Sequence, residues 1–152
     1  MAKKGDGPKI EFRKAGPQDF DFVFSVEAAI KRPAAEKAGH WEEAAARAKA
    51  RPAVRPGEDL IVRVDGVDVG LLALGSYKEL LWLRRLELLP AHQRKGIGTS
   101  IVKTVLQGAR AKGAGVFLRV RKDNPAHALV ERLGFFVSGE SGSEDEMIAP
   151  PG

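Results

Sequence analysis

The sequence predicts an α/β (α+β) fold, a mixed β-sheet with helices on its faces. Two apolar segments flank Asp65-Gly66, a pair typical of a two-residue β-hairpin turn. Ile97, Ile101 and Val105 recur at helical spacing, which predicts an amphipathic helix over about residues 96–112. The elements follow the order β, α, α, three strands, α, β, α, β, β. That order is typical of one sheet covered by helices.

The first half of the chain is predicted to hold one strand and two helices. Residues 10–13 alternate apolar and polar side chains, as a strand does. Gly16-Pro17-Gln18-Asp19 then opens a helix, since proline suits the first helical position and an acid suits the first turn. That helix is expected to run to about Lys31 and to be broken by Pro33. A second helix over residues 40–49 and a loop over residues 51–57 follow.

The second half begins with strands and then alternates helices and strands. Strands are predicted over residues 60–64, 67–74 and 81–89, and the third is apolar on both faces, which indicates a central strand. After the amphipathic helix, capped by Gly113, residues 116–120 form another strand. Asp123-Asn124-Pro125 starts a short helix that Gly134 ends. Residues 135–137 and 146–148 are predicted as two short final strands around a Gly/Ser-rich turn.

Composition favours one compact domain over the whole chain, residues 1–152. Of the 152 residues, 43% are hydrophobic and 30% are charged, which suits a real core and an ordinary polar surface. The absence of cysteine excludes a disulfide framework, a thiolate metal site and a cysteine nucleophile. No apolar run approaches the roughly 20 residues that span a bilayer, and the basic N-terminus lacks a signal-peptide stretch. We therefore expect a cytoplasmic protein without membrane contact and without a metal.

The net charge of +5 bears on possible polyanionic partners. Basic residues are spread along the chain, and the aromatic residues, at 7%, are not interleaved with them. This pattern favours an ordinary surface over a nucleic-acid footprint. A small ligand rich in phosphate would also benefit from the charge.

The segment after the third central strand has the outline of a phosphate site. Pro90 ends that strand, and Gly96-Ile97-Gly98 opens the amphipathic helix. The first turn of a helix has backbone N–H groups without partners, and glycine lets an anion approach the main chain closely. The chain lacks the G-x-x-x-x-G-K-[ST] loop, and Ile101 stands where a Rossmann turn needs a third glycine. A diphosphate bound to backbone amides is therefore expected, with a tight packing turn as the alternative.

Two sequence blocks resemble the GNAT superfamily of acyl-CoA-dependent N-acyltransferases. Residues 88–99, LLPAHQRKGIGT, resemble its acyl-CoA signature, and residues 123–135 resemble its next helix, which commonly ends in Leu-Gly-Phe. The resemblance covers about residues 10–148. It implies a mostly antiparallel central sheet of six to seven strands with helices on both faces, acetyl-CoA as cofactor, and a homodimer.

The resemblance also implies cofactor-binding residues. Backbone amides of the turn would hold the CoA pyrophosphate, and the backbone of Leu88 and Leu89 would pair with pantetheine as a strand does. Asn124 would lie beside the cofactor arm, although a helix N-cap is an equal interpretation. The residues of the turn concerned are Gln93, Arg94, Lys95, Gly96, Ile97, Gly98 and Thr99.

The resemblance implies direct attack of an amine on the thioester, which needs a proton acceptor. Glu87 is the one carboxylate within the central strand and is the candidate base, with an ion pair to Arg85 on the same strand face as the alternative. Glu79 and His92 are weaker candidates.

The acid is where the sequence departs from the family pattern. Val130 stands where many relatives have a tyrosine aimed at the CoA sulfur, so either the thiolate leaves unaided or His127 or water takes the place of that acid.

The identity of the amine acceptor is open. The variable first half would recognise a small-molecule or peptide amine, with Trp41 and Tyr77 as pocket residues, although Trp41 is equally interpreted as a core anchor between helix and sheet. The acidic segment over residues 143–146 either attracts a cationic amine or is solvated surface. The main functional alternative is an acyl-CoA-binding regulatory module with little turnover, supported by Val130. Nucleic-acid binding rests on net charge alone.

Overall fold

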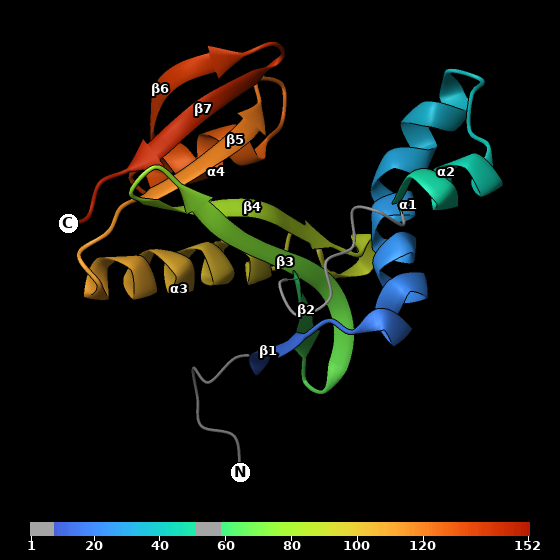
Figure 1. The fold of residues 1–152 in the computed structure, drawn as a ribbon, viewed down its shortest axis with the longest axis horizontal. Coiled ribbons are helices and arrows are strands. Elements are labelled where there is room, and N and C mark those ends of the chain that lie inside the picture. Colours follow the sequence, from blue (N-terminus) through green and yellow to red (C-terminus); the bar gives the residue numbers. More distant parts are fainter. Residues whose placement is uncertain (1–7, 51–58) are drawn as a thin grey trace. The chain divides into compact units, whose positions relative to one another are not determined.

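The computed structural model describes residues 8–50 and 59–152 and confirms the predicted fold class (Figure 1). Seven strands follow the hydrogen-bonded order β1-β2-β3-β4-β5-β7-β6. Strands β4 and β5 are parallel, and the other pairings described are antiparallel. The chain divides into two compact units, Met1–Ala73 with Arg85–Lys95 and Leu74–Arg84 with Gly96–Gly152. The expectation of a single domain stays a prediction.

The first unit is built on the antiparallel strands β1 (Ile10–Lys14), β2 (Asp59–Val64) and the first part of β3 (Val67–Tyr77). Between β2 and β3, Asp65 and Gly66 have φ angles of 52° and 83°, as the predicted two-residue hairpin requires. Strand β3 runs past its predicted end at residue 74. The buried core of this unit contains Ala15, Val23, Ile61 and Leu71.

The first long helix differs from its prediction. A short 3-10 helix, η1 (Pro17–Asp19), leads into α1 (Phe20–Lys37), which contains Pro33 in its interior. The prediction that Pro33 breaks the helix is wrong. The carbonyl that loses its donor at Pro33 belongs to Ala29, which is half-buried beside the exposed residues 30–34, so water can still reach it and replace the lost bond. Beyond it the backbone bonds resume, with Ala38 N–H donating to the Ala34 carbonyl at 3.0 Å.

The second helix, α2 (Glu43–Ala50), begins three residues later than predicted. Glu42 caps it, because its side chain accepts from Ala44 N–H at 3.1 Å and its carbonyl accepts from Ala46 N–H at 2.9 Å. The predicted loop over residues 51–57 lies outside the described residues.

Strand β4 (Leu80–Leu88) is fourth of the seven strands, which confirms its predicted central position. It pairs with β5 (Val116–Arg121) through Leu81–Val116 and Trp82–Phe117. Strand β7 (Glu144–Ala149) lies between β5 and the edge strand β6 (Phe136–Ser141). These two final strands are longer than predicted, because their ladder continues up to the turn at Gly142.

Helices α3 (Ile97–Ala111) and α4 (Ala126–Arg132) both contact β5 within the second unit. The apolar face of α3 is buried as its spacing predicts. Gly113 and Gly134 follow the two helices with φ angles of 73° and 103°, as expected of residues that end a helix. Among residues 8–50 and 59–152, no helix has the length and apolar character needed to cross a bilayer.

Candidate active site

The segment between β4 and α3 has the backbone geometry of an anion site. Arg94 and Gly96 adopt left-handed φ angles of 60° and 80°, which turn the chain into the helix. The first helical bond runs from Ser100 N–H to the Gly96 carbonyl at 3.0 Å, so the amides of residues 97–99 precede the helical ladder. No side chain caps this end of α3. The amides can therefore serve an external acceptor.

The surroundings of this turn suit a negatively charged ligand. A Cβ atom built on Gly96 would meet no atom within 4 Å, so the space beside the N-cap is open. Arg94 and Lys95 are exposed and place positive charge next to the partly positive helix end. Ile97 is only 4% exposed and anchors the helix start in the core. The turn is thus fixed on one side and accessible on the other.

The side chain of Gln93 ties the turn to the end of β4. Its Nε2 donates to the Leu88 carbonyl at 2.9 Å. Leu89 N–H donates to the Val69 carbonyl at 2.9 Å, and the Leu89 carbonyl accepts from His92 N–H at 2.8 Å. Because backbone groups alternate along a strand, those of Leu88 face the edge of β4 away from β3. The expected partner for pantetheine at that edge is therefore Leu88, whose carbonyl already accepts a hydrogen bond from Gln93.

Glu87 lies in an ion-paired cluster within the first unit. Its Oε1 accepts from Arg85 Nη2 at 2.9 Å, so the predicted alternative, a pair on one strand face, is present. The same Nη2 donates to Glu27 Oε1 on α1 at 2.7 Å. The side chains of Glu27, Arg85 and Glu87 are 10%, 18% and 20% exposed, which makes this a largely desolvated group of charges.

Sequence reasoning missed Glu27. The residue follows Val23, Phe24 and Val26 on the buried face of α1, and it is itself 8% exposed. A carboxylate on an apolar helix face needs a partner, and this was the signal that could have identified it. Among the described residues, neither of the other candidate bases makes an ion pair with this cluster: Glu79 is exposed in a turn, and His92 belongs to the 3-10 helix η3 (Pro90–His92).

His127 is held between two carboxylates in the second unit. Its Nε2 lies 2.7 Å from Asp145 Oδ2 on β7, and its Nδ1 lies 3.3 Å from Glu131 Oε1. The bond to Asp145 raises the pKa of His127 above the ordinary value, with Glu131 adding to this and desolvation opposing it. Residues 144–146 belong to β7, and Asp145 is only 9% exposed. The expectation that this acidic segment is solvated surface is therefore wrong for Asp145.

The remaining predicted residues near α4 have structural contacts. Asn124 Oδ1 accepts from Ala126 N–H at 2.9 Å, which caps the start of α4 as the alternative interpretation predicted. Val130 is 5% exposed and belongs to the core of the unit. Among the contacts described within this unit, none joins Asn124 to residues 96–99.

The two aromatic candidates for an acceptor pocket pack against other rings. Trp41 stacks on Phe24 with centroids 6.4 Å apart, and the Arg32 guanidinium lies 5.8 Å from its ring. Tyr77 stacks on Phe117 with centroids 4.0 Å apart. These contacts favour the core-anchor interpretation of Trp41, and they show that Tyr77 packs on a ring of β5.

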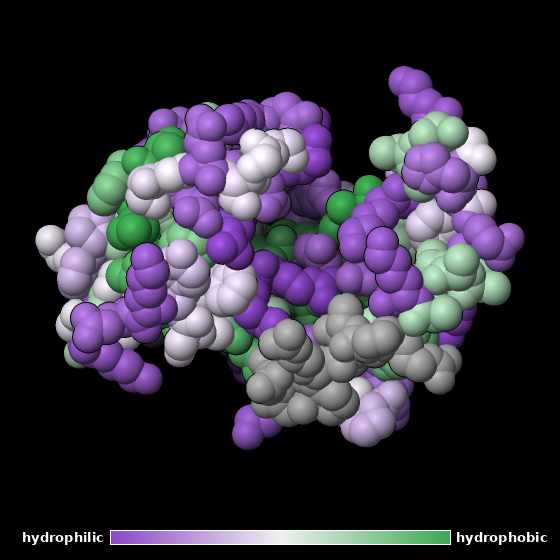
Figure 2. All heavy atoms as spheres, turned by 45° about the horizontal axis from the view of Figure 1, so that its top comes forward, coloured by the Kyte–Doolittle hydropathy of each residue, from purple (hydrophilic) through white to green (hydrophobic). Residues whose placement is uncertain are grey.

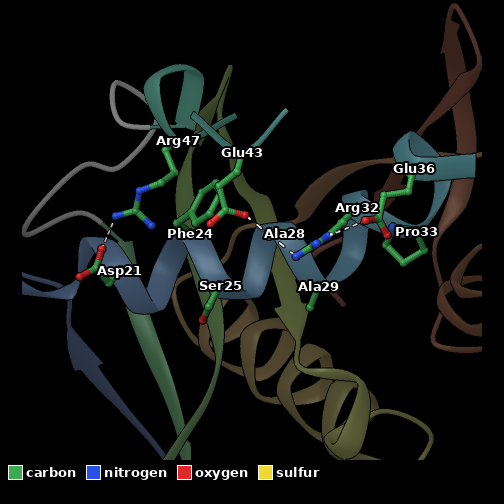
Figure 3. A pocket seen from close by; sticks show the side chains of 10 residues that line it. All are labelled: Asp21, Phe24, Ser25, Ala28, Ala29, Arg32, Pro33, Glu36, Glu43 and Arg47. Carbon is green, nitrogen blue, oxygen red and sulfur yellow. Dashed lines mark hydrogen bonds and ion pairs between the residues drawn. The ribbon is translucent and has the colours of Figure 1, made fainter. Parts of the chain in front are cut away.

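A pocket of about 460 Å³ lies between α1 and α2 (Figure 3). Its charged side chains pair with one another: Arg47 with Asp21, and Arg32 with Glu36 at 3.0 Å and with Glu43 at 4.0 Å. None of the predicted site residues lines it.

Comparison with known protein families identifies one whose model covers the turn and the elements on both sides of it. The model of the acetyltransferase (GNAT) family matches residues 23–135, which include the central strand, the turn and α4. The comparison with curated proteins finds no match.

Solved structures share the fold at low sequence identity. The PaiA N-acetyltransferase of Thermoplasma acidophilum, in complex with coenzyme A, is 20% identical with a TM-score of 0.68, over 93% of this chain and 99% of that chain. An acetyltransferase of Thermus thermophilus is 17% identical with a TM-score of 0.72, over 93% and 97%. The ribosomal-protein-S18-alanine N-acetyltransferase of Escherichia coli is 17% identical with a TM-score of 0.64, over 93% and 94%.

Proposed function

Because the chain belongs to the acetyltransferase (GNAT) family of acyl-CoA-dependent N-acyltransferases, we propose that it transfers an acetyl group from acetyl-CoA to a primary amine of a small molecule or a peptide, by direct attack in a ternary complex. The first turn of α3 carries this proposal, since its uncapped amides and open N-cap suit a diphosphate. Acetyl-CoA supplies the activated acetyl thioester together with that diphosphate.

The turn would hold the cofactor through its main chain. The amides of Ile97, Gly98 and Thr99 point out of the helix start, where the helix dipole favours negative charge. Arg94 and Lys95 add long-range attraction from exposed positions. The residues present therefore fit a diphosphate without any nucleotide-specific side chain.

Gln93 has a specific part in this proposal. Its amide donates to the Leu88 carbonyl, the group that would otherwise accept from the pantetheine chain. We propose that Gln93 protects this strand edge in the free protein and yields the carbonyl on binding. Leu89 stays bonded to β3 through Val69 and would support the edge from behind.

Glu87 is the proposed proton acceptor for the attacking ammonium. One of its oxygens bonds Arg85, and among the described residues the other oxygen, Oε2, has no hydrogen bond or ion pair. That oxygen can accept a proton from the amine directly or through one water. The Arg85 contact fixes the side-chain orientation, which a base needs for efficient transfer.

The chain offers no hydroxyl donor at position 130 for the departing thiolate. Val130 is buried, and His127 is committed to Asp145 and Glu131. We propose that water supplies the proton, because a thiol with an ordinary pKa of about 8.5 leaves readily as its anion. We therefore expect the enzyme to be active but not fast.

We propose that the protein forms a homodimer through β6. This strand is at the edge of the sheet, and its first residues, Phe136 and Val137, are 53% and 45% exposed. Figure 2 shows hydrophobic residues reaching the surface on the side where the C-terminal strands lie. Light scattering should give the mass of two chains, and Phe136→Glu should yield the monomer. A monomeric wild type would overturn this part.

A thermal-shift experiment tests the cofactor site. At a ligand concentration 100 times Kd, acetyl-CoA should stabilise the fold by about 2.7 kcal/mol and raise Tm by roughly 5–10 °C. Gly98→Val should abolish the shift by placing a branched side chain among the amides. Gly108→Val is the matched control, because Gly108 lies in the same helix with nothing within 4 Å of a Cβ. An equal shift in both variants would remove the turn from the site.

Release of free CoA across a panel of amines separates the enzyme from a regulatory module. Turnover with any amine supports the enzyme, and its dependence on amine size distinguishes a small molecule from a peptide N-terminus. Binding of acetyl-CoA without turnover across the panel would favour the regulatory module instead.

A further inference from the structure

The contact between α1 and β4 contains a group of charges that the proposed chemistry uses only in part. Arg85 Nη2 lies 2.7 Å from Glu27 Oε1 and 2.9 Å from Glu87 Oε1. Both bonds come from one nitrogen atom, so each carboxylate receives one of its two hydrogens. Among the described contacts, the guanidinium therefore engages Glu87 through a single nitrogen, and not through the two-pronged contact that arginine usually favours with a carboxylate.

We propose that Glu27 is a positioning residue that balances the charge of Arg85, so that Glu87 stays an effective proton acceptor. This inference rests on the proposed role of Glu87. A cation within about 4–6 Å stabilises a carboxylate anion and weakens it as a base. Glu27 shares that cation from the opposite side, at a place that is only 10% exposed and therefore poorly screened by water.

The charges around Glu27, Arg85 and Glu87 add little to the interactions among these three residues. Lys31 Nζ lies 3.8 Å from Glu27 Oε1, but its side chain is 65% exposed, so solvent screens it. Among the described residues, no further ion pair reaches Glu27, Arg85 or Glu87. One guanidinium thus serves two carboxylates, so these three side chains together carry a net negative charge.

Removal of the charge on Glu27 should weaken Glu87 without displacing it. Glu27→Gln keeps an amide oxygen that accepts from Arg85, so the geometry survives while the full positive charge acts on Glu87. The rising limb in the pH profile of kcat/KM should move to lower pH, and kcat at neutral pH should fall several-fold, because a weaker base accepts the amine proton less efficiently. KM for acetyl-CoA should stay unchanged.

Two variants provide the controls. Glu27→Asp retains the charge and should return the limb most of the way to the wild-type position. Glu36→Gln is the matched control, because Glu36 lies on the same helix and pairs with Arg32 at 3.0 Å, but is 53% exposed. Its profile should coincide with that of the wild type.

Comparison with Glu87→Gln separates the inference from the function on which it rests. If Glu87→Gln flattens the rising limb and Glu27→Gln shifts it, both ideas stand. If Glu87→Gln flattens the limb but Glu27→Gln lowers Tm alone, Glu27 is structural and the inference is overturned. If the limb survives in Glu87→Gln, the base assignment fails and the role of Glu27 fails with it.

Discussion

Gly70 offers the sharpest test of how β3 positions β4, the strand that carries the proposed base Glu87. A Cβ atom built on Gly70 would lie 2.3 Å from the Glu87 carbonyl oxygen and 2.7 Å from Leu88 Cδ2. Ordinary contacts of this kind begin near 3.4 Å, so Gly70→Ala must push β4 away by about 1 Å. The obstacle is backbone, which cannot rotate aside as a flexible side chain can.

The expected cost follows from this displacement. Overpacking in a well-packed core costs about 1–3 kcal/mol, and in a domain of this size that corresponds to a fall in Tm of roughly 3–10 °C. A shift of about 1 Å at a catalytic group can lower kcat about 100-fold. Because Glu87 itself moves, we expect the loss of kcat to exceed what the loss of stability explains.

Circular dichroism melts and acetyl transfer to the best amine of the panel measure the two effects. Gly108→Ala is the control, since this exposed helical glycine has open space and alanine should stabilise it by about 0.5–1 kcal/mol. Replacing glycine with alanine is thus expected to destabilise the protein at position 70 and to stabilise it at position 108. A Gly70→Ala protein with wild-type Tm and wild-type kcat would refute the close approach of β3 to Glu87.

Three further predictions concern the turn and α4. Gln93→Leu frees the Leu88 carbonyl, so isothermal titration should show tighter acetyl-CoA binding by about 1 kcal/mol, whereas weaker binding would make Gln93 part of the cofactor site. Val130→Tyr places a larger side chain at a site that is 5% exposed, and thermal melts should show a loss of about 1–3 kcal/mol with no gain in kcat; a gain would restore tyrosine as the acid. His127 has a raised pKa in the folded protein, so the stability that it adds over His127→Gln should be complete below its ordinary value of 6.5 and disappear as pH rises through the folded value. Urea titrations at several pH values check this, and a difference that grows with pH would contradict it.

The sequence alone determined the fold class and the backbone turn that precedes α3, because both depend on neighbouring residues. Asp65-Gly66 predicts its hairpin through the left-handed conformation that the two residues tolerate. Gly96 and the apolar spacing of α3 likewise predict a helix start that follows a central strand. These features arise within a few residues of chain, where local sterics and hydrogen bonding decide the outcome.

The tertiary structure alone decided which charges meet when they are far apart in the sequence. Glu27 and Arg85 are 58 positions apart, and His127 and Asp145 are 18 apart, so no local pattern pairs them. The continuation of α1 past Pro33 likewise depends on water reaching the half-buried Ala29 and on the helical bonds that resume beyond the proline. A desolvated charge takes whichever partner the packed elements bring within about 3 Å, and that proximity is a property of the folded chain.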